Sequence, residues 1–280
     1  MLAYRHLFHA GNQADVFKHA LFAQLAVALT RKEKPLLYLD THAGIGLYDL
    51  SLPWAQKNAE HLDGIARVRT RPDAPPALAP YLDAVRTENR GGRLRFYPGS
   101  PRIARRFLRP GDRMVLTELN RTDCARLAKL FAHDRQVHVQ LMDGYQALRA
   151  FLPPKERRGL ILIDSSFDRA GEFARLTEAL GNAHQRFATG TYAIWYPLME
   201  PSAVGAFERS MSATGIRKIL KLELAVLPQS WRGSLRGSAM LIVNPPYEFE
   251  LTAEPMLVWI WRALSQNGAG GYKVKWLVGE

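Results

Sequence analysis

Short apolar runs alternate with amphipathic helical stretches along most of the chain. Seven of the runs have the composition of buried strands, and helical patterns separate most of them. The predicted strands are PLLYLD (35–40), RMVLTEL (113–119), VHVQLMD (137–143), GLILID (159–164), TYAIWYPL (191–198), KILKLELAVL (218–227) and SAMLIVN (238–244). This alternation predicts an α/β fold with a seven-stranded, mostly parallel sheet covered by helices on both faces.

Helical patterns of apolar residues fill most of the intervals between these strands. The predicted helices cover residues 15–31, 121–134, 144–152, 170–187 and 202–213. The last two strands differ from the others, because only the loop PQSWRGSLRG joins them. We therefore expect these two strands to pair antiparallel as a terminal hairpin.

The interval between the first two strands is much longer than a single crossover helix requires. Two stretches within it, residues 59–70 and 78–89, have helical patterns, and the proline-rich segment RPDAPPALAP lies between them. We therefore expect one domain over residues 1–280 that carries a small inserted helical subdomain at about residues 47–95.

The charge of the chain favours a polyanionic partner. Lys and Arg number 38 against 26 Asp and Glu, which gives a net charge of +12 in 280 residues. A surplus of this size attracts phosphate groups and releases counterions from nucleic acid. A basic surface that is merely solvated is the alternative for any single cluster of arginines.

Cysteine content and hydropathy indicate the compartment. The single cysteine, Cys124, excludes an internal disulfide framework and a Cys-based zinc site. No apolar run reaches the roughly 20 residues that a membrane span requires, and His and Arg occupy the N-terminus where a signal peptide has its apolar segment. We expect a cytoplasmic protein with no membrane partner.

Three predicted strands end in residues suited to binding a nucleoside, at the carboxyl ends where such sheets bind ligands. The first ends in LDTHAGIG, where Gly44 and Gly46 allow the backbone to approach a ligand closely. The second ends at Glu118, whose carboxylate can accept two hydrogen bonds from a ribose diol. The third ends at Asp143 and Gly144, which suit an adenine amino group and its ring. Each acid could instead cap the next helix, but three at one edge favour a cofactor.

This pattern is typical of class I S-adenosylmethionine-dependent methyltransferases, which have a Rossmann-like fold. A nicotinamide site does not fit, because the expected G-x-G-x-x-G is absent at THAGIG. The chain also resembles the RlmJ family, methyltransferases of the adenine N6 amine in bacterial large-subunit (23S) ribosomal RNA. The segments that carry the resemblance are YRHLFHAGNQADVFKH, YLDTHAGIGLYDL, YPGSP, TELN, MDGY and LILID.

The resemblance implies roles for individual residues. The cofactor contacts that it implies come from Lys18, His19, His42 and Ser100, in addition to Gly44, Glu118, Asp143 and Gly144. It also implies that Tyr4 and His6 lie near the substrate and that Asp164 is the catalytic acid. The inserted helices match the family's small subdomain, which implies that they extend the RNA-binding face.

The chain departs from the family at the catalytic tetrapeptide. Where Asp-Pro-Pro-Tyr is expected, the sequence has Asp164-Ser165-Ser166-Phe167. An adenine amine is a poor nucleophile, because its lone pair is delocalised into the ring. Asp164 and the backbone carbonyl of Ser165 can accept its two N–H bonds, and Phe167 can stack on the base. The missing prolines cost rigidity of about 1 kcal/mol per site, which predicts a slower enzyme rather than an inactive one.

A better match to the tetrapeptide occurs later, at Asn244-Pro245-Pro246-Tyr247. If the strand before it is antiparallel to the first five, its end lies at the opposite edge of the sheet from the glycine loop, roughly 20 Å away for a strand of about six residues. A Pro-Pro pair after a strand more often ends the strand. We therefore assign the chemistry to Asp164.

The function that these residues predict is methyl transfer from S-adenosylmethionine to an adenine N6 amine of 23S ribosomal RNA, protein-free or in early assembly, by a monomer. No metal is expected, because the histidines show none of the usual ligand spacings. Two alternatives stay open. One is a catalytically weakened nucleic-acid-binding protein linked to DNA uptake or use, and the other is a DNA adenine-N6 methyltransferase.

Overall fold

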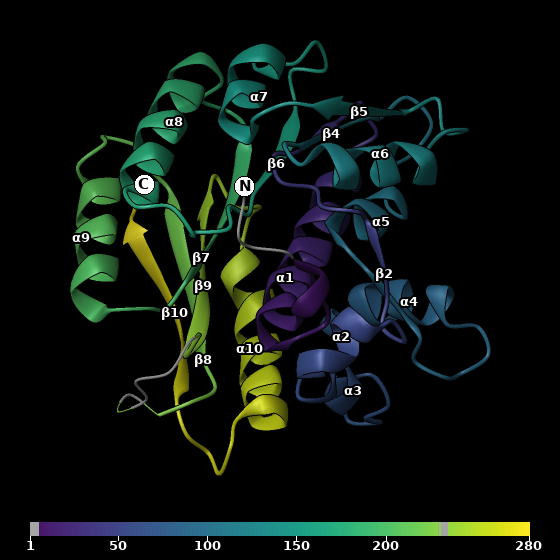
Figure 1. Ribbon diagram of the computed structural model, residues 1–280. Helices are drawn as coiled ribbons and strands as arrows, with labels where there is room; N and C mark the ends of the chain where they lie inside the picture. Colours follow the sequence, from purple (N-terminus) through teal and green to yellow (C-terminus); the bar gives the residue numbers. More distant parts are fainter. Residues whose placement is uncertain (1–5, 229, 231–234) are drawn as a thin grey trace.

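An eight-stranded sheet forms the centre of the molecule in the computed structural model, which describes residues 6–228, 230 and 235–280. The strand order is β10-β8-β9-β7-β6-β1-β4-β5 (Figure 1). Its strands are β1 (Leu37–Asp40), β4 (Arg113–Glu118), β5 (Val137–Leu141), β6 (Gly159–Ile163), β7 (Thr191–Pro197), β8 (Ile219–Ala225), β9 (Gly237–Val243) and β10 (Gly271–Val278). All seven predicted strands are present, and β10 is an additional one.

The directions of the strands decide which loops meet. Strands β5, β4, β1, β6 and β7 pair in parallel, so their carboxyl ends lie along one edge of the sheet. Strand β9 is antiparallel to both β7 and β8, which confirms the predicted hairpin. Its carboxyl end therefore lies at the opposite edge. Strand β10 extends the sheet beyond β8, also antiparallel.

Helices cover both faces of the sheet, as predicted (Figure 1). On one face lie α1 (Gln13–Thr30), α5 (Ser100–Arg105), α6 (Arg121–Leu130) and α10 (Phe249–Leu264). On the other lie α7 (Gly144–Phe151), α8 (Glu172–Arg186) and α9 (Pro201–Ser212). Strand β6 shows why both faces are apolar: Leu160 and Leu162 pack into the core beneath α1, whereas Ile161 and Ile163 pack into the core beneath α8.

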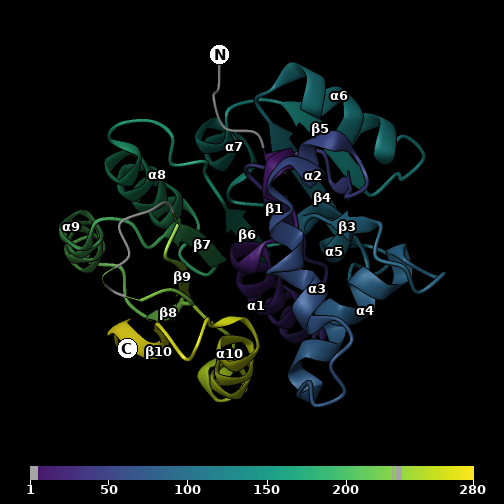
Figure 2. The same cartoon turned by 60° about the horizontal axis from the view of Figure 1, so that its bottom comes forward.

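The segment between β1 and β4 is a run of short helices enclosed by a small hairpin. Strands β2 (Leu47–Asp49) and β3 (Phe96–Pro98) pair antiparallel at its two ends. Between them lie α2 (Pro53–Asn58), α3 (Ile65–Val68), α4 (Ala79–Glu88) and the 3₁₀ turns η2 (Glu60–Leu62) and η3 (Pro76–Leu78). Figure 2 shows these helices beside α1 and α10. The buried side chains of Ile65, Val68 and Tyr81 join the same core as α1.

One predicted helix within this segment is interrupted. Residues 59–70 form η2 and α3 instead of a continuous helix, and the break falls at Gly64. A Cβ atom on Gly64 would lie 2.1 Å from the carbonyl oxygen of Gly11, and the backbone N–H of Ile65 donates to that oxygen at 2.8 Å. Close approach to the chain before α1 therefore determines the course of the segment.

Helix α1 is buried on all sides, because it lies between the sheet, α10 and the inserted helices. Asn12 caps it by accepting a hydrogen bond from the N–H of Asp15 at 3.0 Å. Its first turns also carry buried polar side chains, those of Asp15, Lys18 and His19. Buried charges of this kind are stable only when they are paired. One partner of Lys18, Asp164, lies at the carboxyl edge of the sheet.

The Asn244-Pro245-Pro246-Tyr247 motif lies where the antiparallel hairpin requires. The hydroxyl of Thr191, the first residue of β7, donates to the carbonyl oxygen of Asn244 at 2.9 Å. The Asn244 amide donates to the carbonyl oxygens of Ala188 and Gly190 at 2.7 and 2.9 Å. The motif thus closes the amino end of β7, at the edge opposite the glycine loop, and its amide is occupied by the backbone.

Candidate active site

A pocket of about 880 Å³ lies at the carboxyl ends of the parallel strands. Its walls come from the loops after β1, β4, β5, β6 and β7, from the start of α1 and from residues near η2. Nearly all described candidates from the sequence line it: His6, Lys18, His19, His42, Gly44, Ser100, Glu118, Asp143, Gly144, Asp164, Ser165 and Phe167. Gly46 does not line it, and a Cβ atom there would lie 2.9 Å from the side chains of Leu127 and Leu130. Tyr4 lies outside the described residues.

Glu118 holds the glycine loop in place. Its two carboxylate oxygens accept the backbone N–H groups of Gly44 at 3.0 Å and Asn120 at 2.7 Å. Gly44 has a φ of 59°, in the left-handed region that favours glycine. Burial raises the pKa of Glu118, although these N–H groups oppose the shift. Each oxygen retains a second lone pair, so the carboxylate can still receive hydroxyl donors from the pocket.

Asp143 and Gly144 bring the loops after β1 and β5 together. Asp143 caps α7 by accepting the N–H groups of Tyr145 at 3.0 Å and Gln146 at 3.2 Å, so the capping alternative applies to this acid. A Cβ atom on Gly144 would lie 2.4 Å from the carbonyl oxygen of Thr41. Only glycine therefore permits this packing, and its observed role is the contact between the two loops.

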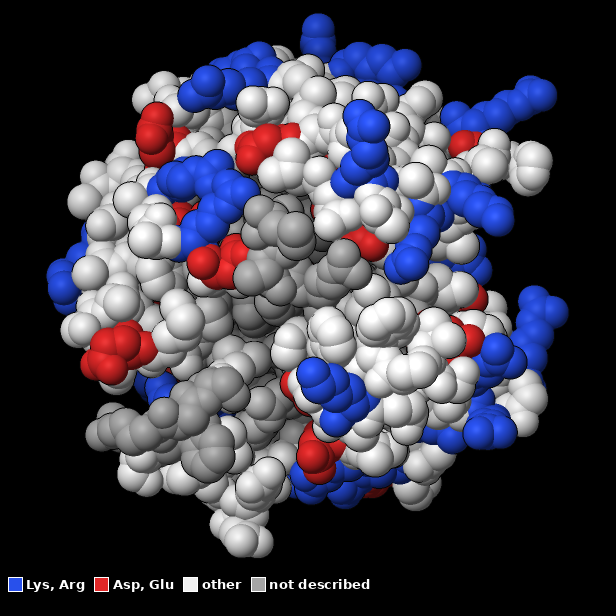
Figure 3. All heavy atoms as spheres, in the orientation of Figure 1, with Lys and Arg blue, Asp and Glu red and all other residues white. Residues whose placement is uncertain are grey.

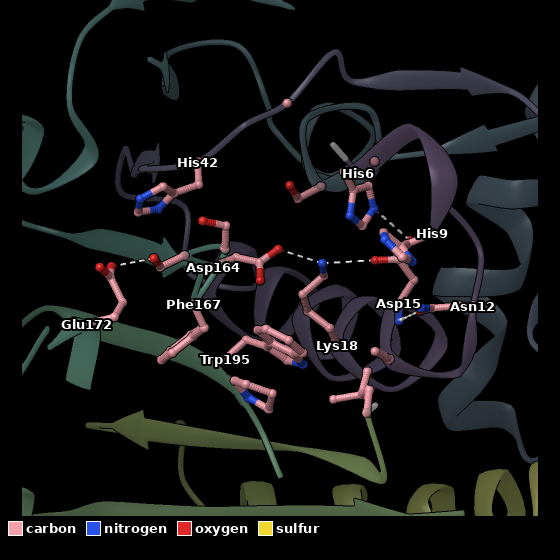
Figure 4. A pocket seen from close by; sticks show the side chains of 18 of the residues that line it. His6, His9, Asn12, Asp15, Lys18, His42, Asp164, Phe167, Glu172 and Trp195 are labelled. Carbon is pink, nitrogen blue, oxygen red and sulfur yellow. Dashed lines mark hydrogen bonds and ion pairs between the residues drawn. The ribbon is translucent and has the colours of Figure 1, made fainter. Parts of the chain in front are cut away.

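Lys18 lies between two carboxylates at the floor of the pocket (Figure 4). Its Nζ is 2.5 Å from Oδ2 of Asp164 and 2.9 Å from Oδ1 of Asp15. Only 5% of the Lys18 side chain is exposed, against 17% for Asp164. Burial alone lowers the pKa of Lys18, but the two carboxylates outweigh it and the pKa is raised. Lys18 therefore stays positively charged and ties α1 to the end of β6.

Asp15 is a site residue that the sequence analysis missed. Besides Lys18, its carboxylate accepts from the Gly11 N–H at 2.8 Å, and its Oδ2 lies 3.0 Å from the ring Nε2 of His6. Burial raises the pKa of Asp15, but His6 and Lys18 oppose it so strongly that the pKa lies well below its usual value. The spacing of three residues between Asp15 and Lys18 was the signal available in the sequence.

Three other residues expected to bind the cofactor, His19, His42 and Ser100, line the pocket and form hydrogen bonds with protein groups. His19 pairs through Nδ1 with the Tyr97 hydroxyl at 2.7 Å, and His42 pairs with Thr41 Oγ1 at 2.8 Å. The Ser100 hydroxyl donates to Asp40 at 2.6 Å. These bonds orient the side chains at the wall.

Asp40, the acid of LDTHAGIG, belonged to the predicted strand end but was given no role of its own. It is fully buried at the end of β1, and it accepts from Ser100 and from the Tyr38 hydroxyl, each at 2.6 Å. Burial raises the pKa of Asp40 to about 6, against the effect of the hydrogen bonds from Ser100 and Tyr38. An acid at the end of a buried strand was the signal for it.

The tetrapeptide after β6 is tightly packed. Phe167 adopts a φ of 52°, a costly conformation for a bulky residue that is found mainly at functional sites. Its ring packs against those of Phe173 and Trp195, with centroids 5.1 and 6.0 Å apart. Ser165 is buried, and its hydroxyl donates to Glu172. Trp195 and Glu172 are the remaining site residues that the sequence analysis missed.

One protein-family model matches most of the chain. The family model described as ribosomal RNA large subunit methyltransferase D, RlmJ, matches residues 33–278. The chain belongs to the RlmJ family. Two RlmJ relatives, both called ribosomal RNA large subunit methyltransferase J, are similar over their whole length: one from Escherichia coli is 44% identical over 280 residues, and one from Haemophilus influenzae is 42% identical over 281.

A solved structure has the same fold over nearly the whole chain. The crystal structure of a Legionella pneumophila protein superposes with a TM-score of 0.90 at 36% identity, over 96% of this chain and 98% of that one. Membership of RlmJ makes the chain a methyltransferase that uses S-adenosylmethionine. The pocket fits such a cofactor, because the glycine loop at Gly44, the Glu118 carboxylate and the Asp143–Gly144 turn line it together.

Three other features concern metal ions, the membrane and the cysteine. No group of three or more His, Cys, Asp or Glu side chains within the described part of the chain is arranged to hold a metal ion. Among the same residues, no helix is both long enough and apolar enough to cross a bilayer. Cys124 is a free, buried residue of α6.

Gly144→Ala should weaken the binding of S-adenosylhomocysteine by at least about tenfold. The added methyl group meets the Thr41 carbonyl and must push the two cofactor loops apart. Gly181→Ala is the matched control, because a Cβ at that position of α8 meets no atom within 4 Å. Calorimetry that gives equal affinities for the two variants contradicts the assignment of Gly144 to the cofactor wall.

Proposed function

We propose that the protein methylates the N6 amine of an adenine in 23S ribosomal RNA. The observation that carries the proposal is Asp164, which lies at the carboxyl end of β6 beside the charged Lys18 and is followed by the aromatic Phe167. The relatives' description as large-subunit ribosomal RNA methyltransferases supports the substrate. We propose further that the enzyme acts in the cytoplasm, as a monomer, on protein-free RNA or an early assembly intermediate.

The chemistry that Asp164 performs is orientation of the amine. Lys18 occupies its Oδ2, whereas Oδ1 has no hydrogen-bond partner among the described residues. That oxygen can accept one N–H of the adenine amine, and the Ser165 carbonyl can accept the other. The two acceptors direct the nitrogen lone pair toward the methyl group, while the Phe167 ring stacks on the base.

Lys18 acts on this step by holding Asp164. A carboxylate with one oxygen fixed by an ammonium group has few rotamers left, so its second oxygen keeps a constant position. The salt bridge also compensates the charge of Asp164 within a partly buried site. Lys18 is therefore assigned to the catalytic carboxylate rather than to the cofactor.

The cofactor occupies the other half of the pocket in this proposal. S-adenosylmethionine supplies the methyl group when it is bound. Glu118 would receive its ribose hydroxyls, and the Asp143–Gly144 turn would face its adenine. His42, Ser100 and the Gly44 backbone would surround the rest of it, with His19 behind them. None of these roles requires a rearrangement of the hydrogen bonds described above.

The charge of the surface supports an RNA partner. Lys and Arg side chains are spread over much of the face shown in Figure 3, with fewer acidic ones among them. Near the pocket, Arg169 is exposed and makes no ion pair with another described residue. The inserted segment 47–95 also presents exposed arginines, among them Arg86, Arg90 and Arg93, and we propose that it extends the RNA-binding face. No feature of the described structure favours DNA or a purely binding role.

Asp164→Ala should lower the rate of methyl transfer by at least about 100-fold, because the amine loses the acceptor that orients it. The affinity for S-adenosylhomocysteine should change by only a few-fold, since the carboxylate does not hold the cofactor. The control is Asn244→Ala, at the opposite edge of the sheet, which should transfer within a few-fold of wild type. An inactive Asn244 variant together with an active Asp164 variant would contradict the assignment of Asp164 as the catalytic residue.

Arg169→Gln should reduce the salt dependence of RNA binding. Loss of one phosphate contact lowers the slope of log K against log salt by about 0.7 to 1. The control is Arg262→Gln, which removes the same charge from an exposed position at the end of α10. Titrations of a ribosomal RNA fragment at several salt concentrations give both slopes, and equal slopes for the two variants contradict a phosphate contact at Arg169.

A further inference from the structure

Glu172 is a buried carboxylate for which the proposed chemistry gives no role. It is the first residue of α8, it lies directly behind the tetrapeptide, and only 6% of it is exposed (Figure 4). Its Oε1 accepts hydrogen bonds from the hydroxyls of Ser165 and Tyr145, the latter at 2.6 Å. Its Oε2 accepts from Arg175 Nη1 at 3.3 Å. A buried carboxylate that accepts from three donors is held in place, because movement away from them would leave its negative charge without partners.

The three donors come from three parts of the active site. Ser165 belongs to the tetrapeptide after β6, and Tyr145 lies in the first turn of α7, next to Gly144. Arg175 lies one turn further along α8, with its guanidinium 5.0 Å from the Tyr145 ring and 3.6 Å from Asp143. Glu172 therefore joins the substrate half of the pocket to the cofactor half.

The bond to Ser165 bears directly on the departure from Asp-Pro-Pro-aromatic. Two prolines hold the backbone of that motif through their rings. In this chain the same positions are serines, and the second acceptor for the amine is the carbonyl of Ser165. A serine backbone rotates freely unless something outside it holds the residue. The Ser165 side chain is held by a charged acceptor, which is the stronger kind of hydrogen bond.

We propose that Glu172 is a positioning residue that fixes the Ser165 carbonyl, and that it supplies the rigidity that the two prolines supply elsewhere in the family. The effect on catalysis rests on the proposed adenine methylation, whereas the hydrogen bond between Glu172 and Ser165 does not depend on it. It predicts that either the Glu172 carboxylate or the two prolines are sufficient to fix the Ser165 carbonyl. Prolines are compatible with the loop, since the N–H groups of Ser165 and Ser166 donate to no other described residue.

The test compares Glu172→Gln in two backgrounds, the natural Ser165-Ser166 pair and the Ser165→Pro/Ser166→Pro double variant. In the serine background, kcat should fall by about 10- to 100-fold, because a misplaced acceptor misaligns the amine. KM for RNA and the affinity for S-adenosylhomocysteine should stay within about threefold of wild type. In the proline background, Glu172→Gln should lower kcat by less than about threefold.

Two further variants complete the set. Ser165→Ala should lower kcat as much as Glu172→Gln, and the combination should be no worse than either. Ser165→Ala removes the hydrogen bond between these residues, and Glu172→Gln removes its charged acceptor, so both act on the same contact. Glu178→Gln, on the exposed face of α8, is the matched control and should leave kcat unchanged. Equal losses from Glu172→Gln in both backgrounds, or additive losses for Ser165 and Glu172, would overturn the proposal.

A measurement without turnover separates this proposal from the proposed function. Protein labelled with 4-fluorophenylalanine gives a ¹⁹F signal for Phe167, which Phe167→Leu identifies. Glu172→Gln should broaden or shift this signal in the serine background and leave it unchanged in the proline background. If wild type transfers no methyl group but the signal responds in this way, only the proposed function fails. If the signal does not respond, the positioning role of Glu172 fails.

Discussion

The ammonium group of Lys18, buried between the carboxylates of Asp15 and Asp164, is the contact on which the rest of the site depends. A charge at this depth is stable only while both partners are present. It therefore fixes the first turns of α1 against the end of β6. The consequences extend to the N-terminal segment, because Asp15 also receives the Gly11 N–H and lies within hydrogen-bond distance of His6. The pocket is thus built around one buried cation.

The two candidate tetrapeptides show that the direction of the preceding strand, and not the match to the motif, decides which of them reaches the pocket. Asp164-Ser165-Ser166-Phe167 follows a parallel strand and faces the pocket, whereas Asn244-Pro245-Pro246-Tyr247 follows an antiparallel one and closes the far edge. The two serines leave Asp164 and Phe167 in place. Glu172 of α8 holds Ser165 through a hydrogen bond. The rigidity of the tetrapeptide therefore comes from this neighbouring helix instead of from proline rings within the motif.

Much of this could be predicted from the sequence, because buried parallel strands are short, apolar and separated by helices. The edge strand β10 was missed since Lys273 and Lys275 interrupt its apolar pattern, as is common at sheet edges. Helix α10 was missed because Pro255 lies within it. At the site, most residues at strand ends were found by their position. Glu172 was not, because only the packing brings it to Ser165 and Tyr145. Asp15 was overlooked although Lys18 lies three residues away, because its burial becomes visible only in the fold.

Methyl transfer onto RNA from a strain lacking the gene tests the account most directly. The purified protein, tritiated S-adenosylmethionine and total RNA are incubated together, the large-subunit RNA is isolated, and its nucleosides are separated. The account predicts that the label is in N6-methyladenosine, despite the two serines in the tetrapeptide. Label in another nucleoside, or none in RNA under conditions where the protein binds S-adenosylhomocysteine, would contradict it.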